Sequence, residues 1–352
     1  MVAVPAYLVL LAPSSNRVYA GDAPGIAAAE LAVLAAAVRL DVTADPQRVT
    51  VAGVPYLGVE VAAADAERAA ALVARLSSAH ALFEVQGELL RPLPLPPSTC
   101  LDDDLLTIPK YPGRTNEQLT RTLLTITLAS TAWPEAAVLG HRSFRVLDPL
   151  AGRGTTLSWA LALGHDAMGV EVERREVEAY DAFLRTWLRR KRVRHTIAFK
   201  PLRRNGVRTA DVLEAELREV GRPSSSEATQ PLSLTLYAAD TLATADLLGK
   251  RKVDAIVTDA PYGVVHGSRS SGGRDRSPAD LLADAIPVWA SVLRAGGAMG
   301  IAWNTHGLRR EELARCCEGA GLQVRDDPAY LRFAHRVDAG IHRDLLVAVK
   351  PT

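Results

Sequence analysis

Hydrophobic residues recur along the chain at two spacings, one typical of strands and one typical of helices. Within residues 1–90 the order is strand, helix, one or two strands, helix, and then the strand-like run ALFEVQG. This order predicts a small α+β sandwich of ferredoxin-like size. The stretch RPLPLPPSTC follows, and because proline cannot continue a helix, we expect a stiff extended linker over residues 91–105.

Residues 106–352 have the pattern of an α/β domain built on a parallel sheet. Residues 117–133 are apolar at helical spacing and end before Pro134. Residues 144–192 then read as strand, glycine-rich turn, helix, strand and helix, an order that implies right-handed crossovers. The runs LSLTLYAAD, VDAIVTDA, GAMGIAWNT and LLVAVK supply further strands, and GRPSSSEATQP has the composition of a disordered surface insertion. We predict a Rossmann-like domain with a mostly parallel, seven-stranded sheet.

Composition narrows the possible classes of protein. The chain has 352 residues, more than one compact core usually holds, and 41 Lys and Arg nearly balance 40 Asp and Glu. Any electrostatic attraction to nucleic acid must therefore come from local clusters. The three cysteines have no metal-ligand spacing and the histidines are dispersed, so we expect no metal. Adjacent Cys316 and Cys317 are poorly placed for a disulfide, which favours a cytoplasmic protein. The apolar N-terminus has no basic segment and is too short to span a bilayer, so we interpret it as a buried strand and expect no membrane partner.

Acidic residues end four of the predicted strands, namely Asp148, Glu171, Asp240 and Asp259. Ligands of an open parallel sheet bind outside the carboxyl ends of its strands, so these acids describe one site. In VLDPLAGRGTT, two glycines allow close backbone approach and the following helix offers unpaired N–H groups. This turn lacks the third glycine of the dinucleotide fingerprint and the lysine of a P-loop, so alone it leaves the ligand open. Glu171, about 20 residues further on, is spaced to accept hydrogen bonds from ribose hydroxyls.

The tetrapeptide Asp259-Ala260-Pro261-Tyr262 follows a run of β-branched residues and has two interpretations. It can be a strand-ending turn, because Asp and Pro favour turns. Alternatively, the Asp259 carboxylate and the carbonyl beside Pro261 could accept both hydrogens of an exocyclic amine and aim its lone pair at a methyl donor. Tyr262 would then offer a ring on which a base can stack.

Together, DPLAGRGTT, GVEVE, AAD and TDAPYG resemble the amino-methyltransferases that use S-adenosylmethionine. With KYPGRTNEQLTRTLLTITLAS and HRVDAGIHRDLLVAV, residues 108–350 are most similar to the tRNA guanine-N2 methyltransferases that carry a THUMP-type N-terminal region. Ala260 departs from this motif, which usually has proline there, and we expect Ala260→Pro to be nearly silent.

The resemblance implies S-adenosylmethionine as cofactor, an RNA partner, most specifically tRNA, and an RNA-docking role for residues 1–90 ahead of a methyltransferase domain at residues 106–352. The implied catalytic residues are Asp259, Pro261 and Tyr262. The implied cofactor contacts are Thr115, Asn116, Glu117, Asp148, Pro149, Ala151, Gly152, Gly154, Thr155, Glu171, Asp240 and Thr241. Read without the resemblance, Thr115 is a fair N-cap for the helix that follows it.

A basic block is the remaining candidate site. Residues 185–208 contain no acidic residue in a nearly neutral chain, which favours phosphate contacts over a merely solvated helix face. The predicted nucleic-acid contacts are Arg189, Arg190, Arg192 and Arg194.

Three alternatives stay open at the level of sequence. A DNA adenine-N6 or cytosine-N4 methyltransferase would use the same tetrapeptide, but the chain has no obvious large domain for reading a DNA sequence. A separate α+β module suits docking on folded RNA, which is read mainly by shape. A non-catalytic RNA-binding protein with a methyltransferase fold is disfavoured by the intact acidic and aromatic positions, and a dehydrogenase by the missing third glycine.

Overall fold

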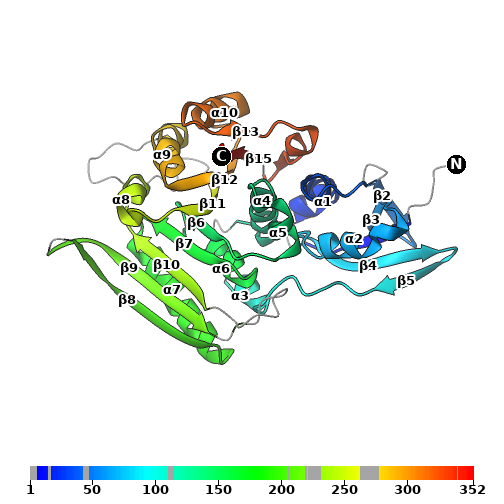
Figure 1. The fold of residues 1–352 in the computed structure, drawn as a ribbon, viewed down its shortest axis with the longest axis horizontal. Helices are drawn as coiled ribbons and strands as arrows, with labels where there is room; N and C mark the ends of the chain where they lie inside the picture. The colour runs from blue at the N-terminus through cyan, green and yellow to red at the C-terminus, as the bar shows by residue number, and fades with distance from the viewer. Residues whose placement is uncertain are drawn as a thin grey trace.

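The computed structural model describes residues 6–14, 17–42, 47–109, 115–204, 206–218, 220, 231–261, 277–338 and 340–352. Within them the chain forms a small sheet and a large sheet with their helices (Figure 1). The predicted insertion GRPSSSEATQP and the segment that contains Tyr262 lie largely or wholly outside the described residues.

The small sheet is antiparallel and has the strand order β2-β3-β1-β4-β5. Its elements are β1 (Tyr7–Leu11), α1 (Arg17–Ala37), β2 (Gln47–Val51), β3 (Val54–Val59), α2 (Ala66–Val73), β4 (Ala79–Gln86) and β5 (Leu89–Leu93). The order β-α-β-β-α-β that the hydrophobic pattern predicts is therefore present, with β5 added at one edge. β5 continues to Leu93, inside the segment predicted as linker.

The large sheet is mixed and contains ten strands. Its order is β13-β15-β12-β11-β6-β7-β10-β9-β8, with β14 paired to β15. The five central strands, from β12 to β10, run parallel, and the pairings outside them are antiparallel. The strands are β6 (Arg145–Asp148), β7 (Asp166–Glu171), β8 (Arg194–Arg204), β9 (Val207–Arg218), β10 (Leu232–Ala238), β11 (Val253–Asp259), β12 (Leu293–Asn304), β13 (Gln323–Val324), β14 (His335–Arg336) and β15 (His342–Val349).

This arrangement confirms the Rossmann-like α/β class, because strand order reverses between β6 and β11 as in other doubly wound sheets. The prediction of seven strands was wrong. The β8–β9 hairpin extends the sheet beyond β10, and β14 adds a short pairing at the opposite side.

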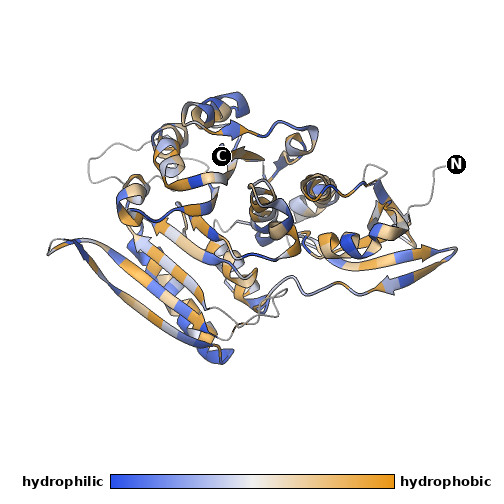
Figure 2. Ribbon diagram, in the orientation of Figure 1, coloured by the Kyte–Doolittle hydropathy of each residue, from blue (hydrophilic) through white to orange (hydrophobic). Residues whose placement is uncertain are grey.

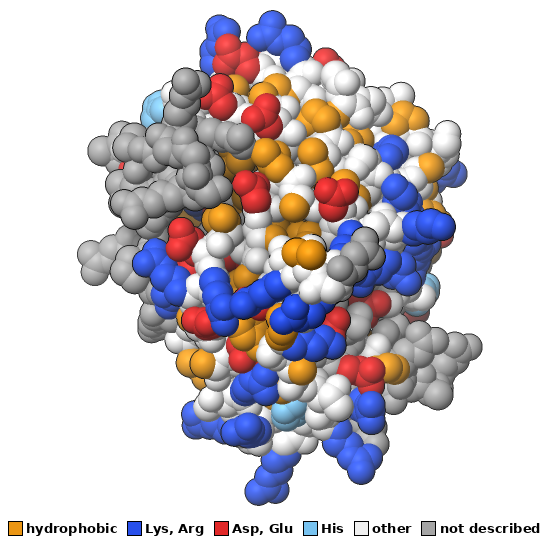
Figure 3. Space-filling model, turned by 90° about the vertical axis from the view of Figure 1, so that its left-hand side faces the viewer, with side chains coloured by type: hydrophobic (Ala, Val, Ile, Leu, Met, Phe, Trp, Pro, Cys, Tyr) orange, Lys and Arg blue, Asp and Glu red, His pale blue; other side chains and the backbone are white. Residues whose placement is uncertain are grey.

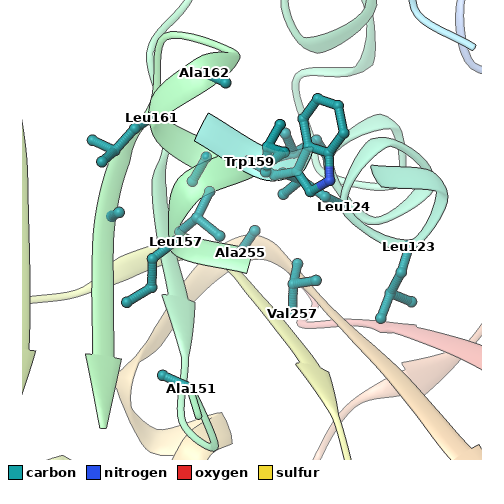
Figure 4. Close-up of a cluster of buried hydrophobic side chains, with 14 of the residues drawn as sticks. Leu123, Leu124, Ala151, Leu157, Trp159, Leu161, Ala162, Ala255 and Val257 are labelled. Atoms are coloured by element: carbon teal, nitrogen blue, oxygen red, sulfur yellow. The ribbon is translucent and has the colours of Figure 1, made fainter. Parts of the chain in front are cut away.

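Helices cover both faces of the large sheet. One buried cluster joins it to α4, α6 and α7, and a second joins it to α8, α9 and α10. Figure 4 shows Leu123 and Leu124 of α4, Trp159 of α6 and Val257 of β11 in the first cluster. Figure 2 shows that the β8–β9 hairpin alternates between apolar and polar residues. The helices are α3 (Asp104–Thr107), α4 (Glu117–Ala129), α5 (Pro134–Leu139), α6 (Thr155–Ala162), α7 (Arg174–Arg190), α8 (Thr244–Leu248), α9 (Pro278–Val292) and α10 (Arg310–Gly319).

Helix α1 belongs to the small sheet but packs directly on α4. Ile26 and Val33 of α1 share a buried cluster with Leu124. Among the described residues, one stretch of α1, Tyr19–Ala37, is long and apolar enough to cross a membrane by length and composition alone. Just over half of this stretch is buried inside the protein.

A buried polar network connects α1 to α4 through the chain between α2 and β4. Glu30 is fully buried and accepts hydrogen bonds from the Ser77 N–H at 3.0 Å and from its hydroxyl at 2.7 Å. The Thr122 hydroxyl donates to Ser77 Oγ at 2.7 Å. Burial raises the pKa of Glu30 to about 7, against the opposing effect of the Ser77 bonds. Between about pH 4.5 and 7, the folded protein therefore keeps on Glu30 a proton that the unfolded chain releases.

This proton makes stability depend on pH. The pKa of Glu30 is higher in the folded protein than in the unfolded chain. Its contribution to the free energy of unfolding is therefore complete below about pH 4.5 and is lost as the pH rises through about 7. Between about pH 5 and pH 8 the free energy of unfolding should fall by roughly 2–3 kcal/mol because the Glu30 carboxyl group ionises. Glu30→Gln should remove that part of the pH dependence in urea unfolding, whereas Glu88→Gln, at an exposed turn, should not. Equal pH dependence in the parent and in Glu30→Gln would contradict the assignment.

Candidate active site

The predicted acidic residues meet at one edge of the large sheet. Asp148 and Glu171 are the last residues of β6 and β7, Asp259 is the last residue of β11, and Asp240 lies two residues beyond the end of β10. These four strands run parallel, so their carboxyl ends lie at the same edge. The edge includes the point between β6 and β11 where strand order reverses, which is where ligands bind in open α/β sheets.

The turn between β6 and α6 folds back against β7. The Asp148 side chain is buried and accepts the Leu150 N–H at 3.0 Å, and the N–H of Ala151 donates to the Val170 carbonyl at 2.9 Å. Burial raises the pKa of Asp148 to about 6. Pro149 is also buried in this turn. The Asp148 carboxylate therefore stabilises the turn between β6 and α6.

Two glycines of this turn have positive φ, 50° at Gly152 and 74° at Gly154. A Cβ at Gly154 would lie 2.8 Å from the Tyr180 ring, so this position requires glycine for both its φ and its packing. A Cβ at Gly152 would meet open space. α6 begins at Thr155, directly after these glycines. The backbone of Gly152 is therefore open to a ligand beside a helix N-terminus.

Glu171 faces this turn. Its Oε2 accepts the Gly152 N–H at 2.8 Å, and its Oε1 accepts the Glu173 N–H at 2.8 Å. Burial raises the pKa of its carboxyl group. Each carboxylate oxygen has a second lone pair, so two further hydrogen bonds can be accepted.

Asp240 and Thr241 follow β10 at the same edge. Asp240 is exposed and its Oδ1 accepts the Leu242 N–H at 2.9 Å. Thr241 is buried, and its hydroxyl accepts the Trp289 indole N–H at 2.9 Å. The free oxygen of Asp240 is thus accessible, while the Thr241 side chain is used in packing.

Asp259 lies between side chains from two distant segments. The Thr115 hydroxyl donates to Asp259 Oδ2, and Arg343 Nη2 of β15 lies 3.6 Å from the same oxygen. Burial raises the pKa of Asp259, and the Arg343 guanidinium and the Thr115 hydroxyl act in the opposite direction. Pro261 is half-buried beside it. The arrangement holds a carboxylate with little solvent around it.

Two interpretations made from the sequence are corrected here. The N-cap of α4 is Asn116, whose Oδ1 accepts the N–H of Gln118 at 2.8 Å, and Thr115 bonds Asp259 instead. The Ala260 N–H donates to the Ala302 carbonyl at 2.8 Å, so Ala260→Pro would remove a hydrogen bond and is not expected to be silent.

The start of α4 is tied to neighbouring elements. Asn116 Nδ2 donates to Ser14 Oγ at 3.2 Å, beside the small sheet. The Glu117 carbonyl accepts the indole N–H of Trp159 at 2.7 Å. These bonds fix the segment from which Thr115 reaches Asp259.

Arg343 was missed from the sequence. It is 4% exposed, at the start of β15, and pairs in register with Asn304 at the end of β12. Asn304 Oδ1 accepts hydrogen bonds from the backbone N–H groups of His306 and His342 at 3.2 and 3.1 Å. The run HRVDAGIHRDLLVAV carries no local signal that one of its arginines faces the strand end of β11.

The arginines predicted to contact nucleic acid lie at the edge of the large sheet opposite the candidate active site. α7 runs back along the sheet from the end of β7 to the start of β8, so Arg189, Arg190, Arg192 and Arg194 lie at the amino edge, away from Asp259. Arg189, Arg190 and Arg192 are exposed. Lys191, between them, pairs with Asp102 and Asp104 at 2.7 Å. In the part of the chain that the structure describes, no group of three or more His, Cys, Asp and Glu side chains could hold a metal ion.

No protein-family model matches the sequence, and no curated protein matches it. Solved structures do resemble it. TrmN from Thermus thermophilus superposes with a TM-score of 0.40 and 16% identity, over 84% of this chain and 56% of that protein, so the chain spans little more than half of TrmN. A SAM-dependent methyltransferase from Agrobacterium tumefaciens gives a TM-score of 0.40 and 13% identity, over 68% and 64% of the two chains. A TehB-like SAM-dependent methyltransferase from Corynebacterium glutamicum gives 0.33 and 15%, over 59% and 81%. At such scores the likeness carries no argument, and the fold rests on the strand order described above.

Proposed function

We propose that the chain is an S-adenosylmethionine-dependent methyltransferase that acts on an exocyclic amine of a nucleobase in RNA, most specifically guanine N2 in tRNA. The observation that carries this proposal is the half-buried Asp259 carboxylate at the strand-order reversal, hydrogen-bonded by Thr115 and facing Arg343. The glycine turn and Glu171 lie on the neighbouring strands of the same edge.

The residues around the glycine turn fit a nucleoside cofactor. Glu171 has accepting capacity left for ribose hydroxyls, Asp240 has an exposed oxygen, and Gly152 presents open backbone. When bound, S-adenosylmethionine would supply an electrophilic methyl group whose carbon–sulfur bond breaks with its electron pair staying on sulfur.

Asp259 would prepare the nucleophile. The lone pair of an exocyclic amine is delocalised into the base, so the nitrogen is a poor nucleophile until its hydrogens are held. Asp259 accepts one hydrogen and the carbonyl beside Pro261 accepts the other, which turns the lone pair toward the methyl group. As the nitrogen–carbon bond forms, the surplus proton on nitrogen passes to the Asp259 carboxylate and then to water. Tyr262, outside the described residues, would stack on the base.

The small sheet is suited to docking a folded RNA beside Asp259. α1 packs on α4. Asn116, the residue that follows Thr115, donates a hydrogen bond to Ser14. A nucleic acid held by this module would therefore be fixed relative to Asp259, as docking of a folded RNA requires.

Identification of the methylated nucleoside tests the proposal. The protein, incubated with S-adenosylmethionine that carries a labelled methyl group and with either in vitro transcribed tRNA or duplex DNA, should label only the RNA. Digestion should place the label on N2-methylguanosine. Label on N6-methyladenine or N4-methylcytosine in DNA would instead select the DNA methyltransferase, and label in neither would contradict both.

A further inference from the structure

The hairpin of β8 and β9 ends at the same edge of the sheet as the candidate active site. β9 is antiparallel to β10 and β8 is antiparallel to β9, so β8 runs in the direction of the central parallel strands. The last residue of β10, Ala238, pairs with Asp211. The described residues 202–204 and 206–210 therefore continue beyond the end of β10. Figure 1 shows this turn extending to the left of the view, past α8.

Three arginines surround the hairpin turn. Arg203 pairs in register with Arg208, and Arg204 pairs with Val207, which is 66% exposed. All three arginines are exposed. In Figure 3, which looks onto this side of the molecule, Lys and Arg side chains gather in the middle of the face.

Carboxylates neutralise this charge only in part. Arg208 pairs with Asp211 at 2.5 Å, but Asp211 also pairs with Arg174 at 2.9 Å. Arg203 and Arg204 donate to the carbonyls of Gly206 and Leu247 at 3.1 and 3.2 Å, and no described carboxylate forms an ion pair with either. The turn therefore carries a net positive charge in a chain that is nearly neutral overall.

We infer that the hairpin turn, Arg203, Arg204 and Arg208, binds phosphates of the RNA a few nucleotides from the nucleotide that is methylated. The inference rests on the function proposed above and names a contact surface for it. Neighbouring strands lie about 4.8 Å apart, so the turn is on the order of 20 Å from Asp259 across the sheet edge. An RNA segment whose target base enters beside Asp259 can reach the turn with phosphates a few nucleotides away.

The basic residues at the other end of the hairpin provide a matched control. Arg189, Arg190 and Arg192, which the sequence predicts as nucleic-acid contacts, are also exposed and carry the same charge, but they lie at the opposite edge of the sheet. Only the turn shares an edge with Asp259. A purely non-specific attraction between the protein's positive charge and RNA would respond equally to the loss of either set.

The experiment compares the triple variant R203Q/R204Q/R208Q with R189Q/R190Q/R192Q and with the charge-retaining R203K/R204K/R208K. The probe is in vitro transcribed tRNA, and the readouts are Kd through a salt titration and single-turnover methyl transfer at saturating RNA. The turn triple should raise Kd roughly tenfold or more and lower the log–log salt slope by about 2 units, because each lost phosphate contact removes about 0.7–0.9. Transfer at saturating RNA should stay near the parent's rate, and the lysine variant should bind nearly as the parent does.

The opposite results separate two failures. An active protein whose turn triple keeps the parent's Kd and salt slope, or loses no more than the Arg189, Arg190 and Arg192 triple, overturns this inference alone. A parent protein that transfers no methyl group to RNA overturns the proposed function, and the inference with it. Thermal melting of both triples, with an unchanged midpoint, excludes loss of fold as the cause.

Discussion

Asp259→Asn should lower methyl transfer by a factor of roughly 100 or more, while cofactor binding and the fold stay close to those of the parent. The loss of one preorganised acceptor typically costs about 3 kcal/mol in the transition state. Asparagine keeps the volume and can still accept the Thr115 hydroxyl, but it removes the negative charge beside Arg343 and presents N–H donors of its own. The measurement is single-turnover transfer to tRNA at saturating RNA and cofactor.

The pH dependence gives a second readout of the same residue. Because burial raises the pKa of Asp259, the rate should rise with pH as this carboxyl group ionises, and that limb should be missing in the residual activity of Asp259→Asn. Thr115→Val is the matched variant, since it removes a hydrogen bond to the same oxygen but leaves the charge, and its loss should be much smaller. Transfer by Asp259→Asn at the parent's rate would reduce the tetrapeptide to a strand-ending turn.

Local patterns were sufficient to predict the α/β class and the shared edge of the acidic residues. The strand ends at Asp148, Glu171 and Asp259 each follow consecutive buried residues, as expected of parallel strands covered on both faces. The order of helices and strands then forces these ends to one edge. Neither step needs information from distant parts of the chain.

Contacts between distant segments could not be predicted in this way. Arg343 reaches Asp259 because β15 pairs antiparallel with β12, and β12 in turn pairs with β11. No local pattern in the sequence specifies these two pairings. The hairpin was missed because Arg194–Arg204 is an edge strand in which four of the seven exposed positions are Arg or Lys, so its alternation was read as a basic run. The packing of α1 on α4 likewise depends on tertiary structure, since the apolar surface of α1 alone does not identify its partner.

Glu171→Ala should weaken binding of S-adenosylmethionine, or of its demethylated product, by roughly 10- to 100-fold, because a hydrogen bond to a charged group contributes about 1.5–3 kcal/mol. Two effects lower the affinity of this variant for the cofactor. The variant loses the acceptors for the ribose hydroxyls, and it releases the Gly152 N–H that anchors the glycine turn to β7. Titration calorimetry with S-adenosylhomocysteine measures the change directly.

Glu173→Ala is the control for this prediction, because it removes a carboxylate two residues away while leaving the backbone N–H that Glu171 accepts. Its affinity should stay within about twofold of the parent's, since an exposed charge near the site contributes little. Glu171→Gln should fall between the two variants, because the amide keeps one acceptor oxygen but turns the other into a donor. If Glu171→Ala binds the cofactor as tightly as Glu173→Ala does, Glu171 is only a support for the turn, and the nucleoside must be held elsewhere along this edge.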